Sequence, residues 1–519
     1  MLMVSPLWQP SQEQIEGSNI AQFMKFLRDN NGETIIDFEA LYTYSLQSPE
    51  AFWFAIWKFC GVKGDPGEPP YLSHPDKMPG ATFFPNATLN FAENLLVKEE
   101  EETAIHFRGE DKVRRKLSWN ALNGQVSQLQ QFFVARGITS GDRVAAMMPN
   151  MPETISALLA TASLGAVWSS CSPDFGIKGV LDRFGQIEPK ILIACDGYYY
   201  NGKTIRIDDK LAEIVHALPS LKAVIVIPYL GKHGEVAASI EKATTLEDVG
   251  GEFAPKALHF EQLAFSHPLY ILFSSGTTGV PKCIVHSAGG TLLQHLKEHK
   301  FHCDLKPDDK LFYFTTCGWM MWNWLVSGLA TGATLLLFDG SPFAPSGEVL
   351  FDYAQEEGMT IFGTSAKYID AIKKAELRPG ETHNLSALRL MASTGSPLAP
   401  ESYDFVYAHI KSDLQLASIS GGTDIVSCFV LGNPVKPVWK GEIQGPGLGM
   451  AVEIFDEVGK PQKSGKGELV CTKPFPAMPI GFWNDPDGHK YHNAYFGRFE
   501  NVWHHGDFAE WTEHGGIII

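Results

Sequence analysis

Short apolar runs alternate with helical patterns from residue 143 onward, and this alternation constrains the fold more than any other feature. It predicts a buried strand over RVAAMM (143–148), a helix over ETISALLATASL (153–164) and a second strand over AVWSS (166–170). Pro152 suits the first turn of the helix, and Gly165 can end it. A strand, a helix and a strand of these lengths form a βαβ unit, which predicts a parallel sheet covered by helices.

Similar runs extend this pattern through most of the chain. Further strand candidates are ILIACD (191–196), AVIVIP (223–228), YILFSS (270–275), LFYFTT (311–316), ATLLLF (333–338), TIFGTS (360–365) and LRLMAST (388–394). The chain has 519 residues, too many for one core. We expect an α/β protein with a helical, aromatic-rich region over 1–95 and parallel-sheet αβ subdomains over 96–260 and 261–430. After about residue 430, short alternating runs rich in Gly and Pro predict a small antiparallel, β-barrel-like subdomain over 431–519.

The composition excludes several classes of function. The formal net charge of −17 argues against a general binder of nucleic acids or membrane surfaces. We find neither a signal peptide nor an apolar stretch of about 18 residues, so we expect no membrane-spanning helix. The eight cysteines are scattered without a C-x-x-C pair, which is typical of reduced thiols in the cytoplasm. The oligomeric state stays open.

The loop SSGTTGVPK (274–282) joins two apolar runs and carries hydroxyls, glycines and one lysine. Its spacing resembles a P-loop, but Pro281 has no N–H for a phosphate and Cys283 replaces the Mg²⁺-binding hydroxyl. The ingredients are still those of a phosphate cradle, with small residues, hydroxyl donors and a cation. A flexible surface turn is the alternative, and it does not explain so many hydroxyls between two buried strands.

This loop resembles the signature of the acyl-adenylate-forming enzymes, the AMP-dependent synthetase superfamily. Three more segments resemble that family in the same order: ASTGSPLAP (392–400), ISGGTDIV (419–426) and WHHGDFAEW (503–511). The resemblance implies the large N-terminal domain of that fold, with ATP or AMP, Mg²⁺ and coenzyme A as ligands.

The resemblance also implies roles for individual residues. The phosphate loop would comprise Ser274, Ser275, Gly276, Thr277, Thr278, Gly279 and Lys282. The adenine, α-phosphate and ribose would contact Gly395, Ser396, Pro397, Gly422, Thr423 and Asp507, and Asp424 would hold Mg²⁺ where the family usually has Glu. Of these, Lys282, Thr423 and Asp424 would be catalytic. His504 and His505 precede Asp507, but neighbours in a strand point to opposite faces, which argues against a metal site there.

The acyl pocket and coenzyme A site are predicted in the same way. The pocket would be lined by Trp319, Met320, Met321, Thr394 and Gly421, and Lys203 would lie near the coenzyme A 3′-phosphate. Core packing is the alternative for Trp319. Gly421 falls where acetate-activating members carry a tryptophan wall, so we expect a larger pocket, with Thr394 donating to a 3-keto oxygen. A tight backbone turn is the alternative for Gly421.

The whole pattern predicts a ligase that makes an acyl-adenylate and then an acyl-CoA, releasing AMP and pyrophosphate. Segments such as MPGATFFPNATLNFAENLL (78–96) and CGWMMWNW (317–324) resemble the members that activate acetoacetate. An acetyl- or propionyl-CoA synthetase and a catalytically silent nucleotide-binding module remain alternatives. The small C-terminal domain that follows a hinge in this family has no counterpart before Ile519, so we expect nucleotide binding with slow thioester synthesis.

Overall fold

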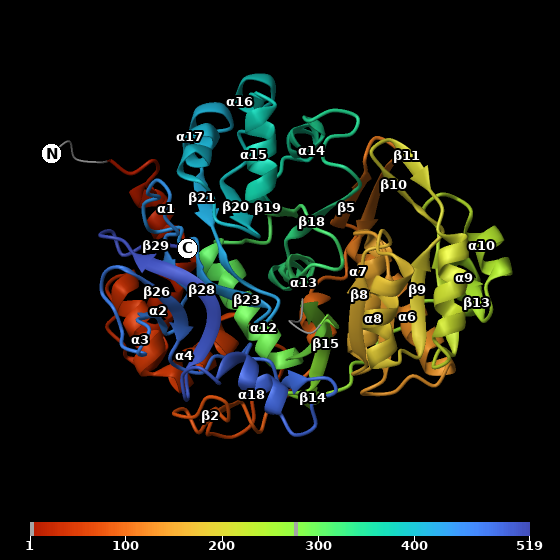
Figure 1. Ribbon diagram of the computed structural model, residues 1–519, viewed down its shortest axis with the longest axis horizontal. Helices are drawn as coiled ribbons and strands as arrows, with labels where there is room; N and C mark the ends of the chain where they lie inside the picture. Colours follow the sequence, from red (N-terminus) through yellow and green to blue (C-terminus); the bar gives the residue numbers. More distant parts are fainter. Residues whose placement is uncertain (1–4, 275–278) are drawn as a thin grey trace.

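The computed structural model describes residues 5–274 and 279–519. Two sheets form its centre and helices surround them (Figure 1). The first sheet contains, in spatial order, β13 (Ala243–Thr245), β12 (Ala223–Ile227), β9 (Ile191–Cys195), β7 (Arg143–Met147), β8 (Val167–Cys171), β15 (Pro268–Ser274), β16 (Lys282–Ser287) and β27 (Gly481–Phe482). The second contains β21 (Gln415–Ser418), β20 (Leu390–Thr394), β19 (Ile361–Ser365), β17 (Lys310–Tyr313), β18 (Thr334–Asp339), β5 (Thr103–Gly109) and β6 (Val113–Ser118).

Both sheets have the parallel core that the sequence predicted. Strands β13 to β15 run parallel, as do strands β21 to β5. Each sheet ends in antiparallel strands, with β16 and β27 on the first and β6 on the second. The α/β fold class is therefore confirmed, with an antiparallel edge on each sheet.

The sheets do not divide at residue 260 as the expected subdomain boundary would require. The hairpin of β5 and β6 joins the second sheet, where residues 105–109 pair with β18, whereas β15 and β16 join the first sheet beside β8. An apolar run shows that a strand is buried but not which sheet it joins, because any parallel sheet accepts such a run on either side.

Helices cover both sheets (Figure 1). The side of the first sheet carries α6 (Trp119–Ala135), α7 (Pro152–Ser163), α8 (Ile177–Ile187), α9 (Asp208–Ala217), α10 (His233–Ser239), α11 (Leu246–Glu252) and the ribbon of β10 (Tyr198–Tyr200) and β11 (Lys203–Ile205). The side of the second carries α14 (Val349–Glu357), α15 (Ala366–Lys374), α16 (Pro379–Thr382) and α17 (Pro400–His409). The centre of the molecule holds α12 (Ala288–Lys297), the π-helix η1 (Glu298–His302), α13 (Met320–Ser327) and the 3₁₀-helix η2 (Gly328–Thr331).

Helix α7 shows how local sequence sets these elements. Pro152 is its first residue, where a missing N–H costs no hydrogen bond. Gly165 follows its end with φ of 70°, a left-handed conformation that suits glycine. Every residue of α7 is buried, and its hydroxyl side chains are satisfied by backbone carbonyls, as Thr161 is by the carbonyl of Ala157 at 2.7 Å.

The N-terminal region packs onto the C-terminal part of the chain. It contains α1 (Gln12–Glu16), α2 (Asn19–Asn31), α3 (Phe38–Gln47), α4 (Pro49–Phe59) and α5 (Phe91–Leu95), with the short strands β1 (Gly64–Asp65), β2 (Leu72–Ser73), β3 (Thr82–Phe83) and β4 (Thr88–Leu89). Strand β14 (Leu263–Ala264) pairs with β4. Trp53 and Trp57 are buried, and the hydroxyl of Tyr42 donates to the carbonyl of Met450 at 2.8 Å.

The C-terminal part forms two small antiparallel sheets. One is built from β22 (Ser420–Gly422), β23 (Ser427–Leu431) and β24 (Gly445–Pro446), and the other from β25 (Val452–Phe455), β26 (Lys466–Cys471), β28 (Trp503–Trp511) and β29 (Ile517–Ile518). Helix α18 (His489–Tyr495) lies against β28. The antiparallel β unit predicted after residue 430 is therefore present.

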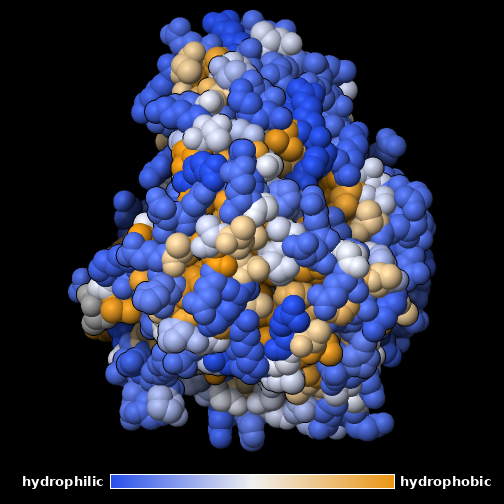
Figure 2. Space-filling view, turned by 90° about the vertical axis from the view of Figure 1, so that its right-hand side faces the viewer, coloured by the Kyte–Doolittle hydropathy of each residue, from blue (hydrophilic) through white to orange (hydrophobic). Residues whose placement is uncertain are grey.

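The surface and the thiols agree with the composition. Figure 2 shows a largely hydrophilic face on the side of the first sheet, with apolar residues in scattered patches. Within residues 5–274 and 279–519, no helix combines the length and the hydropathy that crossing a bilayer requires. All eight cysteines carry free thiols.

Candidate active site

A cavity of about 370 Å³ opens at the carboxyl ends of β20 and β21. Ligands of open α/β sheets bind at this edge. Of the predicted site residues, the cavity is lined by Trp319, Met320, Met321, Thr394, Gly395, Ser396, Pro397, Gly421, Gly422 and Asp507. Ser418, Ile419, Ser420, Ser427, Cys428, Ile443 and Ile519 complete its walls. The adenine, ribose and acyl segments, which are far apart in the sequence, thus meet around one space.

A second cavity is larger, at about 840 Å³, but contains none of the predicted site residues. It is lined by residues from 46–54, 69–76, 472–474 and 501. None of these follows the carboxyl end of a strand in the two large sheets. Volume alone therefore does not identify the site, and we assign the smaller cavity because the chemistry-bearing segments converge there.

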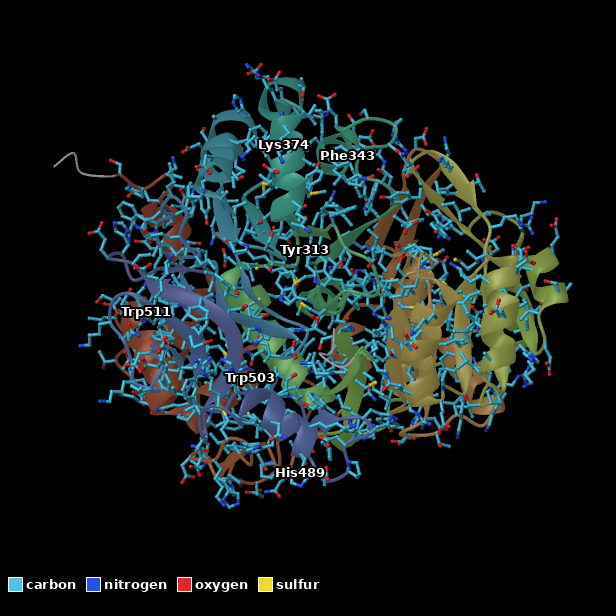
Figure 3. All side chains as sticks on the ribbon, in the orientation of Figure 1. Tyr313, Phe343, Lys374, His489, Trp503 and Trp511 are labelled. Atoms are coloured by element: carbon cyan, nitrogen blue, oxygen red, sulfur yellow. The ribbon has the colours of Figure 1, made fainter. Side chains whose placement is uncertain are left out.

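Beside the smaller cavity, Lys282 and Asp424 form an ion pair. Nζ of Lys282 lies 2.8 Å from Oδ1 of Asp424. The hydroxyl of Tyr495, from α18, donates a hydrogen bond to the same oxygen. Tyr495 is held in place by stacking on Trp503, with ring centroids 4.0 Å apart. Figure 3 shows Trp503 near the centre of the lower half of the molecule, beside α18.

The Asp424 carboxyl is kept ionised by these partners. Burial works to raise its pKa, but the Lys282 ammonium and the Tyr495 hydroxyl lower it below the usual value on balance. The pKa of Tyr495 is raised by burial and by the charge of Asp424, so its hydroxyl stays a donor. An ionised carboxylate oxygen is a ligand that Mg²⁺ prefers, and Mg²⁺ usually needs only one or two such groups beside substrate phosphates. Asp424 therefore fits the predicted metal role.

Thr423 and the phosphate loop lie next to this pair. His286 of β16 donates from Nε2 to the carbonyl of Thr423 at 2.9 Å. Burial lowers the pKa of His286 to about 3, so the imidazole is neutral. Ser274 pairs with Lys282 across β15 and β16, and Gly279 has φ of 89°. The predicted loop residues Ser275, Gly276, Thr277 and Thr278 lie outside the described residues.

Gly421 does not act as a missing wall of the cavity. A Cβ atom added there would overlap the carbonyl oxygen of Ser427 and lie 2.5 Å from Cα of Cys428. Real Cβ atoms essentially never approach heavy atoms closer than 3.0 Å. Gly421 is needed because β22 and β23 pair closely with a register shift at this point. Close strand pairing, rather than the tight turn considered as the alternative, accounts for this glycine, and a tryptophan here could not enter the cavity without moving β23.

Thr394 does not offer a free donor to a ligand. Its hydroxyl donates to the carbonyl of Ile419 at 2.9 Å, which ties the end of β20 to the chain after β21. The proton that we expected to reach a 3-keto oxygen is already used. Thr394 lines the cavity with its methyl group and with the remaining lone pairs of the hydroxyl.

The paired histidines before Asp507 have separate partners, as predicted. Nε2 of His504 lies 2.9 Å from Oε2 of Glu468, whereas His505 lies 3.7 Å from Oδ2 of Asp507 and packs against the ring of Phe429. In the described part of the chain no three histidine, cysteine, aspartate or glutamate side chains group closely enough to hold a metal ion.

Lys203 is exposed on β11 and does not line the cavity. The turn of its ribbon is fixed by the buried carboxylate of Glu110, which accepts the N–H groups of Asn201 and Gly202. Its coenzyme A role stays a prediction. Trp319 is partly buried and packs edge-on against Tyr313, so it both packs and lines the cavity.

Sequence reasoning missed several residues around the site. Ser427 and His286 lie just beyond the quoted segments 419–426 and 274–282, whereas Tyr495 reaches the site only through the tertiary fold. Because 71 residues separate Tyr495 from Asp424, no local spacing could have indicated that contact.

Comparisons with known proteins show the family of the chain. Residues 92–480 match the family described as AMP-binding enzyme. The chain is 61% identical over 514 residues to an acetoacetyl-coenzyme A synthetase of Rhizobium meliloti (strain 1021), covering 99% of this chain and 79% of that protein. It is 45% identical to an acetoacetyl-CoA synthetase of Gallus gallus, covering 99% and 78% respectively. A solved structure, acetoacetyl-CoA synthetase from Streptomyces lividans, is 42% identical with a TM-score of 0.94, over 99% of this chain and 80% of that one. The chain belongs to the AMP-binding enzyme family.

Proposed function

We propose that the protein is an AMP-forming acid–thiol ligase that converts acetoacetate, ATP and coenzyme A into acetoacetyl-CoA, AMP and pyrophosphate. The observation that carries this proposal is the convergence of the nucleotide and acyl segments on one cavity beside Lys282 and Asp424. The choice of acetoacetate is supported by the relatives, which bear the name acetoacetyl-CoA synthetase over nearly the whole of this chain.

In the first step a carboxylate oxygen of acetoacetate attacks the α-phosphorus of ATP. The new phosphorus–oxygen bond gives the acyl-adenylate, and the bond to the β-phosphate breaks to release pyrophosphate. The phosphates repel the attacking carboxylate, so fixed cations and donors must offset their charge. Lys282 supplies a cation, the hydroxyls from Ser274 to Thr278 supply donors, and Thr423 contacts the α-phosphate.

The nucleotide is oriented by the walls of the cavity. The segment Gly395–Pro397 holds the adenine, and Asp507 accepts hydrogen bonds from the ribose hydroxyls. Asp424 would hold Mg²⁺, which when bound supplies positive charge to the phosphate oxygens. Asp424 can do so because its carboxylate is ionised and lies next to the phosphate-binding lysine.

In the second step the sulfur of coenzyme A attacks the acyl carbonyl. A carbon–sulfur bond forms, AMP leaves with the electrons of the carbon–oxygen bond, and the thiol proton passes to solvent. Trp319, the residue before α13, lies beside both the acyl and the adenine segments and lines the path by which the thiol of coenzyme A approaches. The free cysteines fit a reducing compartment, and we place the activity in the cytoplasm.

A panel of short carboxylic acids tests this function. AMP release should depend on acetoacetate and should be weaker with butyrate and weakest with acetate, and thioester should form only when coenzyme A is present. An equal response to acetate and acetoacetate would favour an acetyl-CoA synthetase. Nucleotide binding without acid-dependent pyrophosphate exchange would identify a silent binding module.

A further inference from the structure

A buried carboxylate joins two walls of the cavity from behind. Glu298, the first residue of η1, and its neighbour Lys297 have fully buried side chains, with Nζ of Lys297 3.5 Å from Oε1 of Glu298. Oε1 also accepts the hydroxyl of Ser427 and, at 3.3 Å, the backbone N–H of Cys428. Oε2 accepts the indole N–H of Trp324 at 2.9 Å.

The donors to Glu298 come from two different elements. Ser427 and Cys428 belong to β23 and line the cavity directly. Trp324 belongs to α13, one helical turn after Met320 and Met321, which also line the cavity. The two oxygens of one carboxylate therefore join a strand and a helix that both contribute residues to the cavity lining.

Neighbouring histidines strengthen the same junction. His295 donates from Nε2 to the carbonyl of Val426 at 2.6 Å and contacts Ser327 Oγ through Nδ1 at 2.7 Å. His299 donates from Nε2 to the carbonyl of Trp324 at 2.9 Å. Both side chains are buried, and burial lowers the pKa of His299 to about 3. Burial lowers the pKa of Lys297, and the neighbouring Glu298 carboxylate opposes that shift.

The chemistry of the junction requires a carboxylate. Every partner of Glu298 is a donor, so both of its oxygens must accept. An amide of the same shape has one accepting end and one donating end, and its NH₂ group would face another donor. Burying a charge is costly without complete pairing, and removing one partner of a buried pair is strongly destabilising, so the geometry around this carboxylate is narrowly defined. The π-helix that begins at Glu298 is a rare conformation that is frequent at functional sites.

We propose that Glu298 is a positioning residue for acyl selection, because it fixes the separation between the Ser427–Cys428 wall and the Met320–Met321 wall of the cavity. The inference rests on the proposed function, since it takes this cavity to be the acyl site. Under this proposal the width of the pocket is set by Glu298, which lies behind the cavity lining. Gly421 and Thr394, which line the cavity, do not set it.

The experiment compares Glu298→Gln with wild type in acid-dependent ATP–pyrophosphate exchange, using acetoacetate, butyrate and acetate. Loss of a hydrogen bond to a charged group corresponds to roughly a tenfold effect or more. We expect the KM for acetoacetate to rise about tenfold and its preference over acetate to fall by a similar factor, with the KM for ATP changed less than about twofold.

Glu110→Gln is the matched control. Glu110 is also a fully buried glutamate that accepts three backbone N–H groups, from Asn201, Gly202 and Ser341, but it lies away from the cavity. Its substitution should lower thermal stability and leave the acyl preference unchanged. A loss of preference of similar size in Glu110→Gln would overturn the proposal.

Trp324→Phe provides a second test, including the case in which Glu298→Gln does not fold. Alone it removes one donor and should lower the preference for acetoacetate by a few fold; an unchanged preference would overturn the proposal. Combined with Glu298→Gln it removes the clash between two facing N–H groups, so the double variant should lose less preference for acetoacetate than the sum of the two single losses.

Parallel rises in the KM values for ATP and for acid would show a purely structural role. Absence of acetoacetate-dependent exchange in the wild type would refute the proposed function instead.

Discussion

Lys282 and Asp424 lie 2.8 Å apart although 142 residues separate them in the chain. One begins β16 and the other follows β22, so the ion pair links the first sheet to the small sheet at the cavity. The negative phosphates of a nucleotide would attract the Lys282 ammonium, and the positive Mg²⁺ would attract the Asp424 carboxylate. Both side chains would therefore exchange partners when nucleotide binds, and the pair holds them in position beforehand.

Asp424→Ala should lower acid-dependent pyrophosphate exchange by roughly a hundredfold or more, the range for loss of a key electrostatic group in a transition state. The fold should persist, because Lys282 is partly exposed and can turn to solvent, and Tyr495 keeps its stacking on Trp503. Circular dichroism checks the fold and exchange assays check the rate. Near wild-type exchange in this variant would refute the role of Asp424.

Tyr495→Phe should weaken the same site by removing one donor from the Asp424 carboxylate. Loss of one hydrogen bond to a charged group should raise the KM for MgATP about tenfold. The stability should change little, because the stacking on Trp503 is retained. Tyr491→Phe, on the same helix, is the control, because within the described residues the Tyr491 hydroxyl is buried without a hydrogen-bond partner. Equal effects of the two variants would remove Tyr495 from the site.

The sequence predicts the parts of the site that are local in the chain. Gly395 follows the parallel strand β20, and parallel topology brings such strand ends to one edge of the sheet. Thr423 follows β22 and Asp507 lies in β28, both strands of antiparallel sheets, so their place beside Gly395 could be predicted only from the resemblance to the family.

The remainder depends on tertiary contacts that no spacing encodes. Three features join segments about 70 to 230 residues apart: the placement of β5 in the second sheet, the approach of Tyr495 to Asp424 and the contact of Glu298 with Ser427. Sequence patterns of helices and strands extend over windows of only about 11–18 residues. Gly421 illustrates a different limit. Alignment places a residue at a position, but only the backbone shows where its Cβ would point.

Gly421→Ala should destabilise the protein because its Cβ would meet the backbone of β23. Overpacking of this kind costs about 1–3 kcal/mol. Gly422→Ala is the matched control, since the nearest atom to a Cβ there, outside its own neighbours, is Nε2 of His505 at 3.8 Å. Thermal unfolding should separate the two variants by several degrees. A Gly421→Trp variant that folds normally and prefers acetate would reinstate the pocket-wall interpretation.

Thr394→Val should reduce activity with every acid to the same extent. The substitution removes the hydroxyl that donates to Ile419 and loosens the end of β20, at a cost of about 1 kcal/mol. Thr394→Ser keeps the hydrogen bond and should behave like the wild type. Ratios of kcat/KM for acetoacetate and butyrate provide the measurement. A loss confined to acetoacetate would show that Thr394 recognises the ketone after all.

The stability of the protein should fall as the pH rises towards neutrality because of Asp339. Asp339 is a partly buried residue at the end of β18, where the hydroxyl of Tyr229 donates to its Oδ2 at 3.0 Å. Burial raises its pKa from 3.8 to about 7, and the nearby charge of Glu110 adds to the rise.

Between these two pKa values the folded protein keeps a proton on Asp339 that the unfolded chain has released. Because the native state binds this additional proton, the free energy of unfolding falls as the pH rises through this range. The stabilisation from the proton is fully lost above about pH 7. Each pKa unit corresponds to about 1.4 kcal/mol, so the effect reaches a few kcal/mol. Asp339→Asn carries no titrating group, so its free energy of unfolding relative to the wild type should increase between pH 5 and pH 8. Urea unfolding of both proteins at each pH measures that difference, and parallel pH profiles would show that Asp339 does not titrate in this range.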